Sequence, residues 1–334
     1  MVITRTPFRM SFFGGGSDFP EFFRENKGSV LATTFDKYCY VTVRHLPRFF
    51  EYKSQLTYST TEYVNNYEEI QHPSIREAMK LLDMHELRLI YDSDLPAFSG
   101  IGTSSSFAVG MLNAFYSLKG KYADKKELAD KAIYLERVLC DEAGGWQDQI
   151  SASFGGLNRI EFFENDYTVS PVIISPIRKT ELCDNLLLFY TGLTRFSSDI
   201  QNSTRQQIDS KKVDICEMVS LVYEAEKILV GKGDLCEFGK LLDYAWKLKK
   251  GISNKISTNT IDFFYDKAIK AGALGGKLLG AGGGGFILLY VEKDKQSYVT
   301  SALSDLLYVP FDFEDSGSTV IHYSPETFVL NAES

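Results

Sequence analysis

S-G-I-G-T-S-S-S, at residues 99–106, joins a strand-like segment to a helix-like segment, so it predicts the local order strand, loop, helix. Apolar residues alternate along residues 85–92, which predicts a strand. Apolar residues then recur at helical spacing along residues 107–118, and Gly120 predicts the end of that helix. The stretch therefore predicts a loop of small residues that leads directly into a helix N-terminus.

Such a loop has the chemistry of an anion site. A helix N-terminus leaves backbone N–H groups unpaired and carries partial positive charge, and glycines let a ligand approach the backbone closely. We therefore expect phosphate here, with the hydroxyls of residues 104–106 adding hydrogen bonds or one ligand to Mg²⁺. Simple helix capping is the alternative for the loop taken alone. The Walker A lysine is absent, so this loop would bind a nucleotide without it.

Length and composition narrow the class of protein. The 334 residues suggest about two domains, and 44% hydrophobic with 24% charged residues is ordinary for a globular chain. The net charge of −8 argues against general binding to nucleic acid or to an anionic membrane. A local basic pocket for a phosphorylated substrate is compatible with that charge. The expected partner is a small molecule, and both a monomer and a dimer stay open.

The cysteines indicate a reducing environment. Five are scattered along the chain without a Cys-x-x-Cys pair or a Cys/His cluster, so neither a disulfide framework nor a zinc site is expected. The N-terminal residues lack the apolar core of a signal peptide, and no apolar run is long enough to span a membrane. We expect a cytoplasmic protein with buried free thiols.

Strand-like and helix-like segments mix irregularly in both halves, which predicts an α+β fold rather than a regular βαβ repeat. Residues 184–190 are expected to be a buried strand that opens a second domain, with the crossing in residues 168–179. The expected domains are residues 1–180 and 181–334. Further predicted elements are strands at 39–44, 157–163 and 286–291 and helices at 125–141, within 201–250 and at 260–271.

A glycine segment near the N-terminus, T-P-F-R-M-S-F-F-G-G-G-S-D, occupies residues 6–18. Glycines permit turn geometry that a side chain forbids. Asp18, just after the turn, would accept hydrogen bonds from sugar hydroxyls, and Arg9 would neutralise a transferred phosphate. The alternative is a solvated arginine and an aspartate that caps a helix starting near Phe19.

Two carboxylates further along are candidates for chemistry. Glu136 is the only charged member of an apolar helical stripe, so on a buried stripe it must be paired, protonated or metal-bound. Mg²⁺ favours such oxygens, and a solvated position on a rotated helix is the alternative. Asp148 follows Gly144 and Gly145 in a tight turn, which suits a positioned base or a helix cap.

A third glycine segment, G-G-K-L-L-G-A-G-G-G-G, occupies residues 275–285. Consecutive glycines cost backbone entropy. Close packing on a ligand or another backbone would offset that cost, and a flexible hinge is the alternative. Thr191 and Arg195 in T-G-L-T-R suit a substrate anion, although a lone arginine is usually at the surface. The run K-L-K-K at residues 247–250 is another candidate anion contact, although such runs usually form a solvated helix face.

In order, the three glycine segments resemble the motifs of the GHMP small-molecule kinases. The first is T-P-F-R-M-S-F-F-G-G-G-S-D, the second D-L-P-A-F-S-G-I-G-T-S-S-S and the third K-L-L-G-A-G-G-G-G-F, so the resemblance runs from residue 6 to about residue 286. Within the family, R-x-x-x-x-G-G-G-S-D, G-W-Q-D-Q-I-S-A-S-F-G-G-L-N and Y-T-G-L-T-R are similar to D-glycero-D-manno-heptose 7-phosphate kinases. The galactokinase type of first motif, Gly-Glu-His-Thr-Asp, is absent.

The resemblance implies a two-lobed fold, with an N-terminal lobe like domain 2 of ribosomal protein S5, a ferredoxin-like C-terminal lobe and an active site between them. It implies ATP and Mg²⁺ as cofactors. It places Asp148 as the catalytic aspartate and Arg9 beside the transferred phosphate, with Ser105 and Glu136 on Mg²⁺. The residues implied for ATP are Ser99, Gly100, Gly102, Thr103, Ser104, Ser105 and Ser106, and those implied for the sugar are Gly16, Ser17, Asp18, Gln147, Thr191, Arg195, Gly282 and Gly283.

The implied reaction transfers the γ-phosphate of ATP to the anomeric hydroxyl of a heptose 7-phosphate and gives the 1,7-bisphosphate. Phosphoryl transfer has a loose, charge-dominated transition state, so positioning and electrostatics supply most of the acceleration. The alternatives are a kinase of an unphosphorylated sugar of the fucose, galactose or mannose type, a ligand sensor without turnover, and a decarboxylase of the mevalonate branch.

Overall fold

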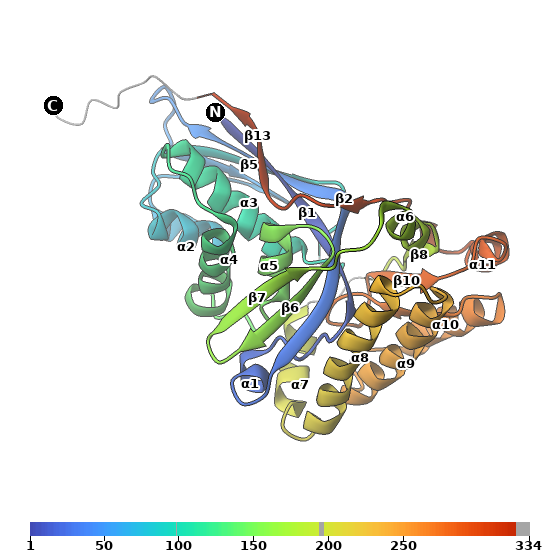
Figure 1. The fold of residues 1–334 in the computed structure, drawn as a ribbon. Helices are drawn as coiled ribbons and strands as arrows, with labels where there is room; N and C mark the ends of the chain where they lie inside the picture. Colours follow the sequence, from blue (N-terminus) through green and yellow to red (C-terminus); the bar gives the residue numbers. More distant parts are fainter. Residues whose placement is uncertain (98, 194–196, 325–334) are drawn as a thin grey trace.

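The computed structural model describes residues 1–97, 99–193 and 197–324. Within these residues the strands form a nine-stranded sheet and a four-stranded sheet. Figure 1 shows the two sheets as neighbouring lobes, each with its own group of helices. The mixture of helices and strands in both lobes confirms the predicted two-lobed α+β fold.

The larger sheet is built around two long antiparallel strands, β1 and β2. Its main path runs β13-β1-β2-β5-β3-β4; β6 and β12 also pair with β2, and β7 pairs with β6. Arg9 on β1 lies opposite Thr34 on β2. The strand bounds are β1 Val2–Phe13, β2 Gly28–His45, β3 Ser54–Thr57, β4 Thr61–Val64, β5 Leu87–Ser93, β6 Asn158–Phe163, β7 Asp166–Pro171, β12 Phe313–Glu314 and β13 Thr319–Tyr323.

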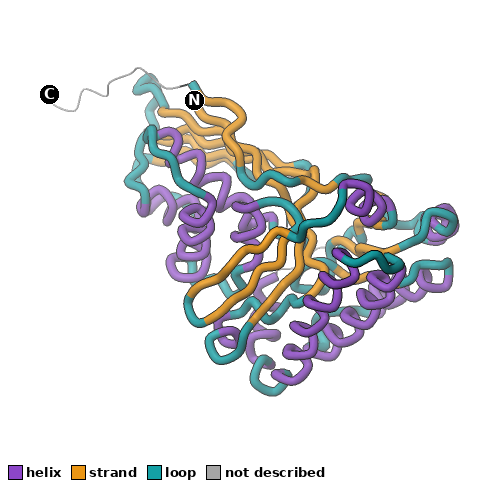
Figure 2. The backbone as a smooth tube through the Cα atoms, viewed as in Figure 1, coloured by secondary structure: helices purple, strands orange, loops and turns teal. Residues whose placement is uncertain are grey.

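Helix α3, Thr103–Leu118, is the central helix of this lobe. Its residues from Thr103 to Tyr116 are buried except for Ser104, as expected for a helix that is apolar on almost every side. It packs on β1 and β2, and Figure 2 shows further helices beside it on the same side of the sheet. Other helical elements of this part of the chain are α1 Pro20–Phe23, η1 Tyr67–Glu69, α2 Pro73–Leu81, α4 Lys125–Tyr134 and α5 Gln147–Phe154.

The helix predicted at residues 125–141 is confirmed from Lys125 to Leu139, but its type changes along its length. The α-helix ends at Tyr134, and a π-helical segment, Leu135–Leu139, continues it. Such wide turns are rare and often mark functional positions. Glu136 lies in this segment and is 1% exposed, which confirms the buried alternative for that carboxylate.

The smaller sheet is antiparallel, in the order β11-β8-β10-β9. Its strands are β8 Leu186–Tyr190, β9 Gly275–Leu278, β10 Phe286–Tyr290 and β11 Leu307–Tyr308. The helical region after residue 200 resolves into three helices, α7 Ser197–Gln207, α8 Lys212–Val230 and α9 Cys236–Ile252. The remaining helices are α6 Pro176–Asp184, α10 Asn259–Lys270 and α11 Gln296–Ala302.

The lobes share a hydrophobic core. Phe12 and Phe13 at the end of β1 meet Phe238 of α9 edge-on, with ring centroids 5.4 and 5.2 Å apart. The division at residues 180 and 181 stays a prediction. The last two strands, β12 and β13, pair with β2 and β1 of the larger sheet, so the chain returns to its first lobe at the end.

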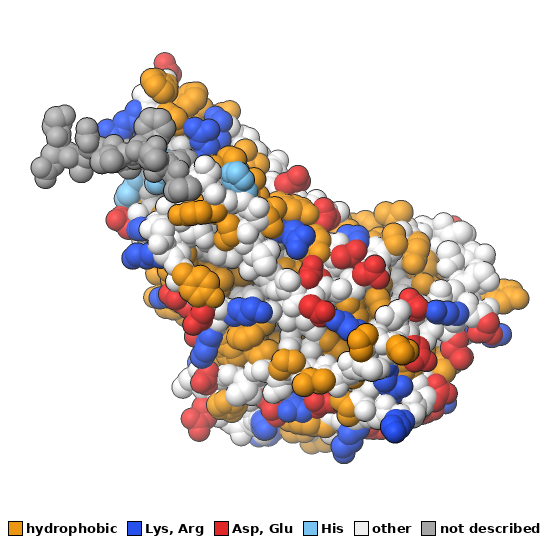
Figure 3. All heavy atoms as spheres, turned by 45° about the horizontal axis from the view of Figure 1, so that its top comes forward, with side chains coloured by type: hydrophobic (Ala, Val, Ile, Leu, Met, Phe, Trp, Pro, Cys, Tyr) orange, Lys and Arg blue, Asp and Glu red, His pale blue; other side chains and the backbone are white. Residues whose placement is uncertain are grey.

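The surface and the thiols bear on two further expectations. Acidic and basic side chains are interspersed on the face in Figure 3. Among the described residues no helix has the length and apolarity needed to cross a membrane. All five cysteines are free; the expected burial holds for Cys39 and is wrong for Cys216, which is exposed.

Candidate active site

A pocket lies where the larger sheet meets α7, α9 and the third glycine segment. One wall carries Arg9 of β1, Gly16 and Asp18 of the following turn, and Gln147 and Asp148 of α5. The opposite wall carries Gln201 and Thr204 of α7, Lys249 and Ile252 of α9, and Gly280. Five of the predicted site residues therefore meet in one place although up to 139 positions separate them.

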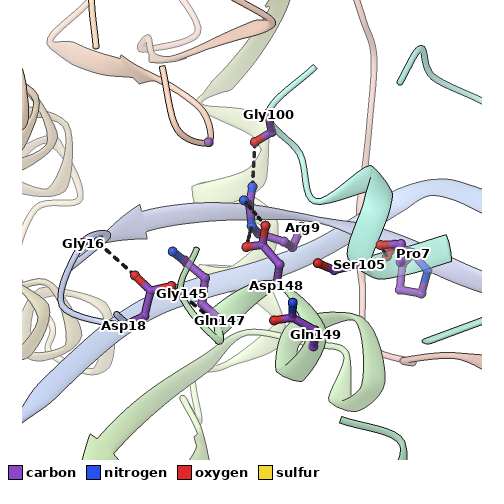
Figure 4. A network of polar contacts seen from close by, with 12 residues as sticks. Pro7, Arg9, Gly16, Asp18, Gly100, Ser105, Gly145, Gln147, Asp148 and Gln149 are labelled. Atoms are coloured by element: carbon purple, nitrogen blue, oxygen red, sulfur yellow. Dashed lines mark hydrogen bonds and ion pairs between the residues drawn. The ribbon is translucent and has the colours of Figure 1, made fainter. Parts of the chain in front are cut away.

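Arg9 and Asp148 form a two-point ion pair at this site (Figure 4). Arg9 Nε donates to Asp148 Oδ1 at 2.7 Å and Nη2 donates to Oδ2 at 2.9 Å, while Nη1 donates to the Gly100 carbonyl at 2.8 Å. The arginine is 4% exposed. Such paired bonds fix orientation as well as charge. Arg9 thus holds the Asp148 carboxylate, and each oxygen of that group keeps a further acceptor position.

Asp18 is held by backbone groups instead. Its Oδ1 accepts from the Gly16 N–H at 3.0 Å and its Oδ2 from the Gln147 N–H at 3.3 Å. Its own carbonyl accepts from the Trp146 N–H at 3.0 Å. Burial, followed by the nearby charge of Asp148, raises the pKa of this carboxyl above its usual value. These bonds join the first glycine turn to the start of α5, and neither aspartate acts as a helix cap.

Glu136 lies behind the N-terminus of α3, where three neutral side chains donate to its carboxylate. Ser104 Oγ donates to Oε1 at 2.8 Å, Ser105 Oγ donates to Oε2 at 2.7 Å, and the Gln149 amide also donates to Oε2. No group of three or more His, Cys, Asp or Glu that could by itself hold a metal ion occurs in the described part of the chain. A hydroxyl and one carboxylate nevertheless fit Mg²⁺, which keeps waters and substrate phosphates as its other ligands.

The second glycine segment presents the backbone of α3. Gly102 precedes the helix at φ 78° without a side-chain cap, and the Ser106 N–H makes the first helical bond, to the Gly102 carbonyl. The N–H groups of residues 103–105 therefore have no acceptor within the helix. Ser99 and Ser106 are buried and donate to the carbonyls of Pro96 and Pro7, at 2.6 and 2.9 Å. Their hydroxyls hold the loop and the helix in place.

The third glycine segment packs on the second, backbone against backbone. A Cβ on Gly280 would lie 2.3 Å from the Gly100 carbonyl oxygen, and one on Gly285 would lie 2.1 Å from that of Ser99. Glycine is required at these positions because the two loops touch. At these two positions the glycines accommodate another stretch of backbone.

The other predicted substrate residues hold backbone in the described structure. Ser17 donates to the carbonyls of Gly14 and Ser29, and Thr191 donates to that of Gly285. Gly282 and Gly283 pack against Ile256. Arg195 lies outside the described residues.

Sequence reasoning gave the run at residues 247–250 as a candidate anion contact or a solvated face and did not single out Lys249. The solvated face holds for Lys247, which is exposed. Lys249 is only 8% exposed and donates to the Gly280 carbonyl at 2.5 Å. The buried positions of α9 include Leu242, Ala245, Trp246, Lys249 and Ile252. Lys249 is the charged member of that stripe, so the helical periodicity that singled out Glu136 would have found it.

Two family models match the chain. The model for the GHMP kinases N terminal domain matches residues 69–156, and the model for the GHMP kinases C terminal domain matches residues 224–308. Together they span just over half of the sequence and lie one in each lobe.

Individual relatives agree with the models. The D-glycero-alpha-D-manno-heptose 7-phosphate kinase of Campylobacter jejuni is 29% identical over 90% of this chain and 93% of its own length. The L-fucokinase/L-fucose-1-P guanylyltransferase of Bacteroides fragilis is 31% identical over 61% of this chain and 22% of its own length. The crystal structure of a D-glycero-D-manno-heptose 1-phosphate kinase from Bacteroides thetaiotaomicron matches with a TM-score of 0.79 and 26% identity, over 97% of this chain and 100% of that one.

Proposed function

The chain belongs to the GHMP kinase family and is a sugar kinase that uses ATP, and on that premise we propose that its acceptor is the anomeric hydroxyl of a heptose 7-phosphate. The product would be the 1,7-bisphosphate. The long alignment with a heptose 7-phosphate kinase and the fold match to a heptose phosphate kinase support this acceptor. The names of those two proteins give the phosphate different positions, so the position of transfer is part of the proposal.

The Arg9–Asp148 pair is the single observation that carries the proposed chemistry, phosphoryl transfer to a hydroxyl group. In the proposed reaction the acceptor oxygen forms a bond to the γ-phosphorus, and the bond from that phosphorus to the bridging oxygen of ADP breaks with its electron pair. Asp148 orients the acceptor hydroxyl and receives its proton. Arg9 fixes the direction of the Asp148 carboxylate and adds positive charge beside the phosphoryl group.

The N-terminus of α3 is the proposed phosphate site. Its free N–H groups and partial positive charge favour the phosphates of ATP, and the exposed Ser104 is at the same end of the helix. Ser105 and Glu136 would hold Mg²⁺, which neutralises developing phosphoryl charge when bound. Thr103, Gly100 and Gly102 complete the same loop.

The sugar is proposed to lie against Asp18 and Gln147. Asp18 has one bond from a backbone N–H to each oxygen, so acceptor positions remain for sugar hydroxyls. The Gln147 Oε1 atom is buried and has no hydrogen-bond partner in the described structure. A sugar hydroxyl would supply the donor that this amide oxygen lacks. Cytoplasmic location and oligomeric state stay predictions.

An acceptor screen tests the proposal. The protein would be assayed with ATP and Mg²⁺ on D-glycero-D-manno-heptose 7-phosphate, the unphosphorylated heptose, fucose, galactose and mannose, and the products would be assigned by ³¹P NMR. We expect turnover with the heptose 7-phosphate and a new anomeric phosphate signal. The fucokinase relative found by sequence makes fucose the specific competitor. Turnover of an unphosphorylated sugar with none on the heptose 7-phosphate would replace our assignment.

A further inference from the structure

Lys249 is a buried cation with most of its hydrogen-bonding capacity unused. It lies on the inner face of α9, 8% exposed, and lines the pocket beside Ile252. A lysine ammonium has three N–H donors. The Gly280 carbonyl is the one acceptor found for it among the described residues. Burying a charge without full hydrogen bonding is costly, so a ligand that supplies acceptors would complete this group.

The groups around Lys249 leave it available to an anion. Two basic side chains, Arg9 and Lys277, and two carboxylates, Asp18 and Asp148, act on it or on its neighbours. Burial, followed by the charge of Lys249, lowers the pKa of Lys277 well below its usual value, so Arg9 and Lys249 are the cations of the pocket. The donors of Arg9 are directed to Asp148 and Gly100. Lys277 donates to the Phe12 carbonyl, at a distance of 2.8 Å, and does not line the pocket. Lys249 is therefore the cation in the described pocket that can turn toward a substrate anion.

The position of Lys249 narrows the kind of anion. Its acceptor, Gly280, packs on Gly100 of the loop that leads into α3. The ammonium is thus fixed to the place where the second and third glycine segments touch. Phosphoryl groups are the anions that the substrates of a sugar kinase bring to this place. A lysine suits them as a compact point charge.

We propose that the Lys249 ammonium binds a phosphoryl oxygen of one of the substrates. That oxygen would supply an acceptor for the N–H donors of Lys249 that Gly280 does not use. The proposal rests on the kinase activity of the family and is independent of the identity of the acceptor sugar. The phosphoryl group belongs either to the γ-position of the nucleotide or to the phosphate of the acceptor. The experiment below separates these two sources.

The test compares Lys249→Met with Lys247→Met. Methionine keeps the apolar stem of Lys249 and removes the charge, whereas Lys247 is exposed on the same helix and pairs with Asp243. Isothermal titration with Mg²⁺ would measure ADP, the non-hydrolysable ATP analogue AMP-PNP, heptose 7-phosphate and free heptose. Thermal unfolding would establish that each variant is folded. A second variant, Lys249→Arg, keeps the charge in a different shape.

The affected ligand identifies the phosphoryl group. A loss of about 10–100-fold in affinity for AMP-PNP with ADP unchanged assigns the γ-phosphoryl group, and the same loss for heptose 7-phosphate with free heptose unchanged assigns the acceptor phosphate. Both results support the proposal, and the nucleotide arm needs no knowledge of the acceptor. Unchanged affinity for both phosphorylated ligands in a folded Lys249→Met protein would overturn it, as would equal losses in Lys247→Met.

A pH profile gives an independent readout. Burial, followed by the charge of Arg9, lowers the pKa of Lys249 to about 8, against the opposing effects of Asp18 and Asp148. Lys249 loses its charge as the pH rises through that value, so kcat/KM of the wild type should fall above about pH 8. Lys249→Arg, whose charge persists, should lose this alkaline limb. An identical limb in that variant would show that another group titrates.

Discussion

The two walls of the pocket hold their charges in opposite ways. On the wall formed by β1 and α5, Arg9, Asp18 and Asp148 all have partners within the protein. On the wall formed by α9 and the third glycine segment, Lys249 has one carbonyl and lies beside the apolar Ile252. The first wall is therefore organised before any substrate arrives, which is how electrostatic catalysis avoids reorganisation. The second wall needs the substrate to complete it.

Asp148→Asn should have the largest effect, because it removes the central charge of the organised wall. We expect kcat to fall about 10²–10⁴-fold while affinity for ADP changes little, measured by steady-state kinetics and calorimetry. Thermal unfolding is the control, since Arg9 would lose part of its buried partner. Turnover within a factor of ten of the wild type would mean that Asp148 takes no part in the chemistry. The Arg9–Asp148 pair would then have only a structural role.

Gly280→Ala tests the backbone that supports the second wall. The new Cβ would lie 2.3 Å from the Gly100 carbonyl oxygen at a φ of +74°, so overpacking adds to backbone strain and we expect a loss of about 2–5 kcal/mol in the free energy of unfolding. Gly120→Ala is the matched control, because its φ is +67° with nothing within 4 Å. It should lose only about 1–2 kcal/mol. The free energies of unfolding would be measured by chemical denaturation. Equal losses in Gly280→Ala and Gly120→Ala would mean that the two loops can move apart at little cost.

Glu136→Gln tests the carboxylate behind the organised wall. If Glu136 holds Mg²⁺, the metal concentration for half-maximal activity should rise at least about 10-fold, with activity recovered at high Mg²⁺. The titration would be repeated with Glu142→Gln. That neighbour is exposed, yet partial desolvation, followed by the charge of Glu136, raises the pKa of its carboxyl to about 7. An unchanged Mg²⁺ requirement in Glu136→Gln would limit Glu136 to holding Ser104 and Ser105.

Asp18→Asn should give the smallest change, a rise of about 10-fold in the KM for the sugar with a smaller effect on kcat. It also changes how stability depends on pH. Burial raises the pKa of Asp18 above 3.8, so the folded wild type loses stability as the pH rises from that value through the raised pKa. The variant has no such loss. Its melting temperature relative to the wild type should therefore increase between pH 4.5 and 7.5, and a constant difference would contradict a raised pKa.

Local pattern located most elements of the fold. The predicted strand at residues 286–291 and helix at residues 260–271 agree with β10 and α10 to within one residue at each end, because alternation and helical spacing are local properties. The π-helical segment at Glu136 and the return of β12 and β13 to the larger sheet were not foreseen. Both depend on tertiary packing, which the period of a short segment does not record.

The residues of the site also divide into those that local sequence indicated and those that only the tertiary structure reveals. Arg9, Asp18 and Asp148 were marked by the glycines beside them, since glycine clusters indicate constrained turns. The pairing of Arg9 with Asp148 spans 139 positions and could not be derived from either segment. Lys249 was hidden in a run of charges because only the orientation of α9 decides which member of the run faces inward.

The pairing of β13 with β1 has a consequence for synthesis. Residues 319–323 supply the neighbour along the outer edge of the first strand, so the ribosome must translate more than 300 further residues before that strand is flanked on both sides. An unpaired strand edge is a template for other chains. A nonsense codon shortly before this segment should consequently yield a polypeptide that self-associates and is degraded, rather than a slightly shorter working enzyme.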